Sequence, residues 1–92
     1  MDFEWDDDKQ LKVLHKHGID FEDAIGIFEG FVAEQRSDRF GEARWTAIGP
    51  TGSGMIALVY TMRGEVRRVI TARPARKYER REYHARQPEG SS

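Results

Sequence analysis

The side chains best suited to phosphate chemistry gather near the end of this 92-residue sequence, between positions 73 and 81. Arg73, Arg76, Arg80 and Arg81 lie there, and a guanidinium group is always charged and matches two phosphate oxygens with its planar fork. Glu79 is a candidate general base, although the neighbouring arginines keep it ionised and lower its basicity. Its alternative role is a helix-surface salt bridge. The arginines themselves either bind phosphate or are simply solvated.

Three further side chains outside this group each have a chemical and a structural interpretation. His17 is the best acid–base candidate because imidazole titrates near neutrality, but a histidine in the last turn of a helix also stabilises the helix dipole. Tyr83 either stacks on a nucleic-acid base or donates to a phosphate, or it packs against a sheet. Lys9 either contacts backbone phosphate or pairs with Asp6.

Metal and thiol chemistry have little support. The sequence has no cysteine, which excludes disulfides, cysteine-bound zinc and thiol nucleophiles. The three histidines show no ligand spacing with acidic residues, and His15 and His84 are interpreted as surface or boundary residues. The run at 6–8 is more simply a helix cap than a magnesium site, and the loop at 49–54 lacks the Gly-Lys-Ser/Thr ending of a phosphate loop. We expect no metal and no cofactor.

The net charge of −1 hides a strong asymmetry along the chain. Residues 1–42 carry 12 acidic and 5 basic side chains, whereas residues 63–86 carry 9 basic and 3 acidic ones. A basic end favours a polyanionic ligand and leaves the acidic end for another partner. The alternative is a solvated distribution that compensates itself.

The N-terminal third predicts a short strand and two helices. Residues 2–5 alternate in polarity and predict an edge strand. Residues 7–17 predict a helix between an aspartate cap and a C-terminal glycine, with Leu11, Leu14 and His15 facing inward. A second helix begins after Asp20 and ends at Gly30, and it buries the stripe that follows: Phe21, Ala24, Ile25 and Phe28.

The remainder predicts strands and a final helix. A strand opens at 31–33 and leads into a polar stretch, and residues 43–72 form a three-stranded meander with a loop at 49–54 and a tight turn at 63–65. Trp45 and Tyr60 are interpreted as core residues. A basic helix covers 75–86 and a loose tail covers 87–92. Helices followed by strands indicate a single α+β domain over 1–92, with helices on one face of an antiparallel sheet.

A series of short motifs along the chain resembles the BrnT family. The matching segments span residues 2–83 in the family's order and approximate spacing. They are Phe3-Glu4-Trp5-Asp6 with Lys9, Lys16-His17-Gly18-Ile19, Phe21-Glu22-Asp23-Ala24, Glu42 with Arg44-Trp45, Ile48-Gly49, Val59-Tyr60-Thr61, Ile70-Thr71-Ala72-Arg73, and Glu79-Arg80 with Tyr83.

This resemblance implies a ribonuclease toxin with a RelE-like fold that halts translation and acts without a metal. It also implies a BrnA-like antitoxin with a ribbon-helix-helix DNA-binding domain, and the toxin reaches operator DNA only through its complex with this antitoxin. The N-terminus has no charged-then-apolar leader and the chain has no apolar run of membrane length, so we expect a cytoplasmic protein. From the residues and this resemblance together we expect two groups of functional side chains. The catalytic group is His17, Arg73, Glu79, Arg80 and Tyr83, and the RNA-binding group is Lys9, Arg76 and Arg81.

Two departures from the family pattern and two other functions bear on this interpretation. The family often has proline and another basic residue where this chain has Asp7 and Pro74, and Pro74 affects the register of the last helix. The first alternative function is a non-catalytic RNA- or DNA-binding module, because basic surfaces serve binding and cleavage alike. The second is an interaction domain whose acidic face docks a basic partner.

Overall fold

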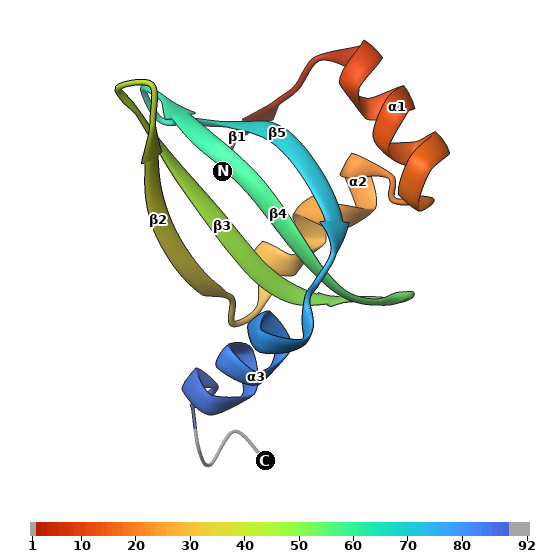
Figure 1. Cartoon of the computed structure of the whole chain (residues 1–92). Helices are drawn as coiled ribbons and strands as arrows, with labels where there is room; N and C mark the ends of the chain where they lie inside the picture. Colours follow the sequence, from red (N-terminus) through yellow and green to blue (C-terminus); the bar gives the residue numbers. More distant parts are fainter. Residues whose placement is uncertain (1, 89–92) are drawn as a thin grey trace.

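The computed structural model describes residues 2–88 and shows one five-stranded sheet with helices on both faces (Figure 1). The strand order is β1-β5-β4-β3-β2, and all neighbours are antiparallel except β1 and β5. The predicted α+β class is confirmed, whereas the predicted tail lies largely outside the described residues. In chain order the elements are β1 (Asp2–Glu4), α1 (Asp7–His17), α2 (Phe21–Ala24), the 3-10 helix η1 (Ile25–Glu29), β2 (Ala33–Arg39), β3 (Glu42–Thr51), β4 (Gly54–Arg63), β5 (Val66–Pro74) and α3 (Lys77–Arg86).

Helix α1 has the predicted bounds but buries a different face. The Asp6 carboxylate accepts a hydrogen bond from the Asp8 amide at 2.8 Å, and Gly18 ends the helix at φ 69°. Val13 is the buried residue, whereas Leu11 and Leu14 are 62% and 41% exposed, and His15 is exposed as well. The prediction that these three side chains face inward was wrong, because the docking of α1 against β5 selects the face that carries Val13.

The second helix begins as predicted and then tightens. The Asp20 carboxylate accepts from the Glu22 amide at 2.9 Å, but the α-helix lasts only four residues before it becomes η1. A 3-10 helix has three residues per turn, so Ile27, three residues after the buried Ala24, also enters the core at 2% exposure. Ile25 and Phe28 pack against the core only partly buried.

The sheet extends beyond the predicted segments. The strand predicted to open at 31–33 begins only at Ala33, and part of the predicted loop at 49–54 belongs to β3. Most of the polar stretch after Ala33 is β2, joined to β3 by a two-residue turn in which Phe40 and Gly41 have φ of 52° and 75°. The loop predicted at 49–54 shrinks to a tight turn, since β3 continues through Gly49. A Cβ on Gly49 would lie 2.8 Å from Cβ of Ile27, so glycine permits η1 to approach the sheet closely.

The two faces of the sheet are covered unequally. The N-terminal helices pack on one face over the main core, which contains Phe21, Leu58 and Val69. Helix α3 packs on the other face at one end only, where Tyr83 and Ala75 belong to a second buried cluster together with Ile48. The expectation that all helices share one face was therefore wrong for α3. Among residues 2–88, no helix has the length and apolar composition needed to cross a membrane.

Candidate active site

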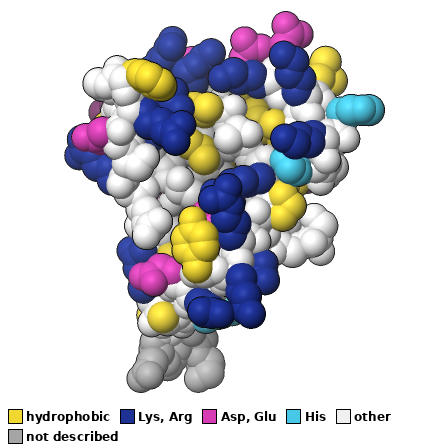
Figure 2. Space-filling model, in the orientation of Figure 1, with side chains coloured by type: hydrophobic (Ala, Val, Ile, Leu, Met, Phe, Trp, Pro, Cys, Tyr) yellow, Lys and Arg dark blue, Asp and Glu magenta, His cyan; other side chains and the backbone are white. Residues whose placement is uncertain are grey.

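The uncovered part of the sheet forms a groove beside the start of α3. Its volume is about 310 Å³. Four of the lining side chains are arginines, and Figure 2 shows Lys and Arg side chains along this side of the molecule. The lining residues are Ser37, Arg39, Arg44, Thr46, Val59, Ile70, Thr71, Arg73 and Arg76.

The end of β5 and the start of α3 are joined by a bidentate ion pair. Arg73 donates to the two carboxylate oxygens of Glu79 at 2.7 and 2.9 Å. Glu79 also accepts from the backbone amide of Arg76 at 2.8 Å, so one carboxylate both holds a guanidinium and caps the helix. The helix consequently begins at Lys77 with Arg76 as its N-cap, two residues after the predicted start at Ala75.

These contacts favour a positioning role for Glu79 over the predicted role of base. The hydrogen bonds from Arg73 outweigh the desolvation of Glu79, lower the pKa of the carboxyl and raise that of the Arg73 guanidinium. Glu79 is only 4% exposed, and both oxygens already accept hydrogen bonds. A carboxylate with a lowered pKa and occupied oxygens is a weak proton acceptor.

Of the other predicted α3 residues, Arg76 lines the groove and the rest do not. Arg80 and Arg81 are exposed, and Arg80 donates to the carbonyl of Ala75 at 2.8 Å. Tyr83 is 5% exposed, and its ring lies 5.2 Å from that of Phe31. Its surroundings fit the packing interpretation and leave no open ring face for a base.

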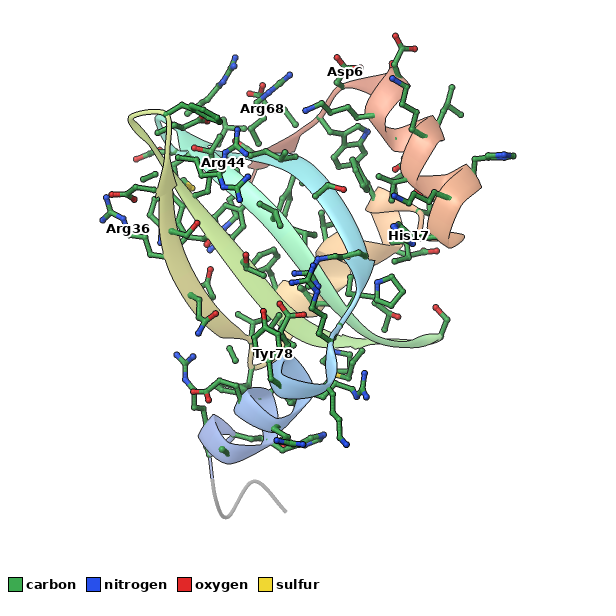
Figure 3. All side chains as sticks on the ribbon, in the orientation of Figure 1. Asp6, His17, Arg36, Arg44, Arg68 and Tyr78 are labelled. Atoms are coloured by element: carbon green, nitrogen blue, oxygen red, sulfur yellow. The ribbon has the colours of Figure 1, made fainter. Side chains whose placement is uncertain are left out.

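The predicted residues of α1 lie outside the groove. Lys9 is exposed and His17 is half-buried. Figure 3 shows His17 beside β5 at the end of α1, and α1 packs on β5, the strand that carries Arg73. Within residues 2–88, no three histidine and acidic side chains are grouped in a way that could hold a metal ion.

Sequence reasoning did not select the groove residues of β2 and β3. Arg39 and Arg44 lie on facing strands, and Nε of Arg44 is buried without a hydrogen-bond partner. The Arg44 guanidinium is 3.7 Å from Glu42, a long ion pair, which leaves much of its donor capacity for a ligand. The sequence did carry one signal for them. Side chains two positions apart on a strand share one face of the sheet, so residues 37 and 39 of β2 share a face, as do residues 44 and 46 of β3.

Tyr78 was also missed. It is 55% exposed, and Figure 3 shows its side chain in front of the sheet where α3 begins. The sequence places it between a basic residue and Glu79, where nothing distinguishes it from a surface tyrosine.

The fold and groove define a small α+β domain with a strongly cationic surface on one face of its sheet, as a protein that handles a polyanion requires. Comparison with family models identifies its class: residues 5–79 match the ribonuclease toxin BrnT of type II toxin–antitoxin systems. The chain belongs to the BrnT family of ribonuclease toxins, and a type II system implies a protein antitoxin as its partner. No individual curated protein matches it significantly.

Proposed function

We propose that this protein is an endoribonuclease that binds RNA in the arginine-lined groove, cleaves it without a metal ion and thereby inhibits translation in the cytoplasm. The observation that carries the proposal is the fixed Arg73 guanidinium, which lies with Arg39, Arg44 and Arg76 around one cavity. We retain the RelE-like assignment of the fold as part of this proposal.

The cations suit a reaction in which the RNA supplies its own nucleophile. The 2′-hydroxyl oxygen attacks the adjacent phosphorus and loses its proton, the P–O5′ bond breaks, and the 5′ oxygen gains a proton. The products are a 2′,3′-cyclic phosphate and a 5′-hydroxyl end. Negative charge grows on the phosphorane oxygens, and preorganised guanidinium groups stabilise it. Arg73 is the principal candidate because Glu79 fixes its orientation.

His17 remains our proposed proton-transfer group. Its support is its chemistry and its place on α1, next to the strand that carries Arg73. Lys9, Arg80 and Arg81 remain proposed contacts to the RNA backbone outside the groove. Glu79 acts through Arg73, and Tyr83 acts by packing α3 on the sheet.

The test is cleavage of end-labelled RNA in excess EDTA. We expect the wild type to cut and to leave cyclic phosphate ends, and Arg73→Ala, Arg76→Ala and His17→Ala to lose activity. Arg36→Ala is the matched control, because Arg36 is also an arginine of β2 but its side chain lies on the opposite face of the sheet from the groove. There its guanidinium carbon lies 5.5 Å from the centre of the Trp45 ring, which packs against the main core. RNA that is bound but never cut would instead indicate the non-catalytic binding module.

The antitoxin is proposed to be a BrnA-like ribbon-helix-helix protein that covers the groove and carries the complex to operator DNA. The exposed acidic residues Glu22 and Asp23 of α2 offer it a second contact surface. Asp20 is the cap of that helix, so its reversal also disturbs the fold. Reversal of Glu22 and Asp23 to lysine is expected to weaken antitoxin binding, and unchanged affinity would refute this second contact.

A further inference from the structure

The most unusual feature of the cationic face is an exposed aromatic ring among the arginines. Tyr78 follows the N-cap of α3 by two residues, and its neighbour Glu79 is buried while Tyr78 is 55% exposed. In Figure 2 a hydrophobic side chain lies between dark-blue ones where Figure 3 labels Tyr78. Folding leaves this ring in water although α3 packs on the sheet directly beside it.

We propose that Tyr78 is a base-stacking residue, and that the groove therefore takes a single-stranded segment of RNA with an unpaired base on this ring. The inference rests on the proposed function and names its substrate class. It assigns the phosphates of the strand to the arginines and one nucleobase to Tyr78.

The geometry places the ring next to the phosphate-binding groups. Tyr78 lies in the chain between Arg76, which lines the groove, and Glu79, which holds Arg73. The Tyr78 phenol also contributes to the raised pKa of Arg73, which places the two side chains within electrostatic reach. A nucleotide whose phosphate contacts Arg73 or Arg76 therefore has its base near this ring.

The surroundings of the ring suit a flat ligand. Tyr78 borders a small hollow together with Gln35 of β2 and Glu82 of α3. The amide and the carboxylate offer hydrogen-bonding groups to the edge of a stacked base, and the ring offers its face. A phosphate alone uses none of these groups.

Stacking on a protein side chain requires an unpaired base. In an RNA duplex both faces of each base are covered by its neighbours, whereas unpaired bases are commonly stacked on tyrosine. A duplex offers this surface only its phosphates and 2′-hydroxyls. Single-strand preference is thus a consequence of the Tyr78 position and does not follow from the arginines.

The experiment measures affinity for a short single-stranded RNA in which every 2′-hydroxyl is methylated, so that binding is separated from cleavage. Tyr78→Phe keeps the ring and Tyr78→Leu removes it, while Leu11→Ala removes an exposed apolar side chain of α1 as a control. We expect Tyr78→Leu to bind about tenfold more weakly, the fold-change that corresponds to ~1.4 kcal/mol of stacking. Tyr78→Phe and Leu11→Ala should stay within about twofold, and urea unfolding should show all three variants folded.

A second measurement reports stacking directly. A 2-aminopurine base in the same RNA should be quenched on binding by the wild type and by Tyr78→Phe, and should remain bright with Tyr78→Leu at saturation. A duplex of the same sequence should bind all variants equally.

The outcomes that overturn the proposal are distinct. Wild-type affinity in Tyr78→Leu, with loss in Arg73→Ala, would refute stacking and leave the proposed function intact. Equal loss in Tyr78→Phe and Tyr78→Leu would assign the role to the hydroxyl. Loss of antitoxin affinity alone would make Tyr78 a protein contact, and a wild type that neither binds nor cuts RNA would refute the proposed function itself.

Discussion

Replacement of Glu79 tests whether the Arg73–Glu79 pair organises the site. Glu79 accepts two hydrogen bonds from Arg73 and one from the Arg76 amide, and its side chain is only 5% exposed. Alanine removes all three contacts and leaves the Arg73 guanidinium without its partner. Glutamine keeps an oxygen that can accept from the Arg76 amide but loses the charge.

The expected cost follows from these contacts. Breaking a buried ion pair costs about 3–5 kcal/mol, but the Arg73 side chain is 24% exposed, so water recovers part of this. Loss of the helix cap adds about 1 kcal/mol. We therefore expect Glu79→Ala to lower the free energy of unfolding by about 3 kcal/mol, and Glu79→Gln to cost about 1 kcal/mol less because it keeps the cap.

The assay is urea unfolding followed by tryptophan fluorescence. Trp45 stacks on Tyr60 with ring centroids 5.6 Å apart, and Trp5 packs edge-on against Phe21, so both indoles report the core. A double-mutant cycle with Arg73→Ala should give a coupling energy of about 2 kcal/mol. Because the Glu79 pKa is lowered on folding, this stabilisation is fully present above the ordinary glutamate pKa, about 4.3, and is lost as the pH falls through the folded-state value.

An organising role for the Arg73–Glu79 pair would be refuted if both variants cost less than about 0.5 kcal/mol, the usual range for surface substitutions, or if the coupling energy to Arg73 were near zero. Activity provides a second criterion. A positioning residue leaves the pH profile of the residual cleavage unchanged in Glu79→Gln, whereas loss of the acidic limb of that profile, where the base loses its proton, would identify Glu79 as the base after all.

Three further predictions concern the fold. Phe40→Asn should raise the free energy of unfolding by about 1 kcal/mol in urea titration, because Phe40 is 97% exposed at a positive φ that asparagine adopts more readily; no gain would show that the turn is unstrained. Gly49→Ala should cost about 1–3 kcal/mol, since its Cβ would collide with Ile27, and an unchanged urea midpoint would contradict this close approach. Burial and the hydrogen bond to Glu34 raise the pKa of Tyr60 to about 12, so stability should be intact below about pH 10, where free tyrosine titrates, and fall as the pH rises toward 12. Tyr60→Phe should remove this component of the alkaline loss, and an identical pH dependence in the variant would assign the loss to other groups.

Local signals in the sequence were sufficient for most helix and turn boundaries. The bounds of α1 follow from the Asp6 cap and Gly18, and the start of α2 follows from Asp20. Strands β4 and β5 and their turn were also predicted, because alternating polarity and turn residues act over a few positions. The basic character of 63–86 and the BrnT resemblance are likewise properties of the sequence, and the family match confirms the latter.

Tertiary structure alone decided which side chains meet. The burial of Val13 in place of Leu11 and Leu14 depends on how α1 docks on β5. The same holds for the two tyrosines of α3, where packing on the sheet buries Tyr83 and leaves Tyr78 exposed. Helical spacing puts Tyr83 on the same face of α3 as Glu79 and puts Tyr78 on another face, but only the docking of α3 on the sheet decides which of these faces is buried.

The groove is formed by residues that lie far apart in the sequence. Arg39 and Arg44 reach it from facing strands, while Arg73 and Arg76 reach it from the β5–α3 junction. Their identity as basic residues was evident from the sequence, but their convergence required the register of β2 with β3 and the pairing of Arg73 with Glu79. Capping and turn preferences act between near neighbours, whereas a site of this kind depends on contacts between residues far apart in the chain.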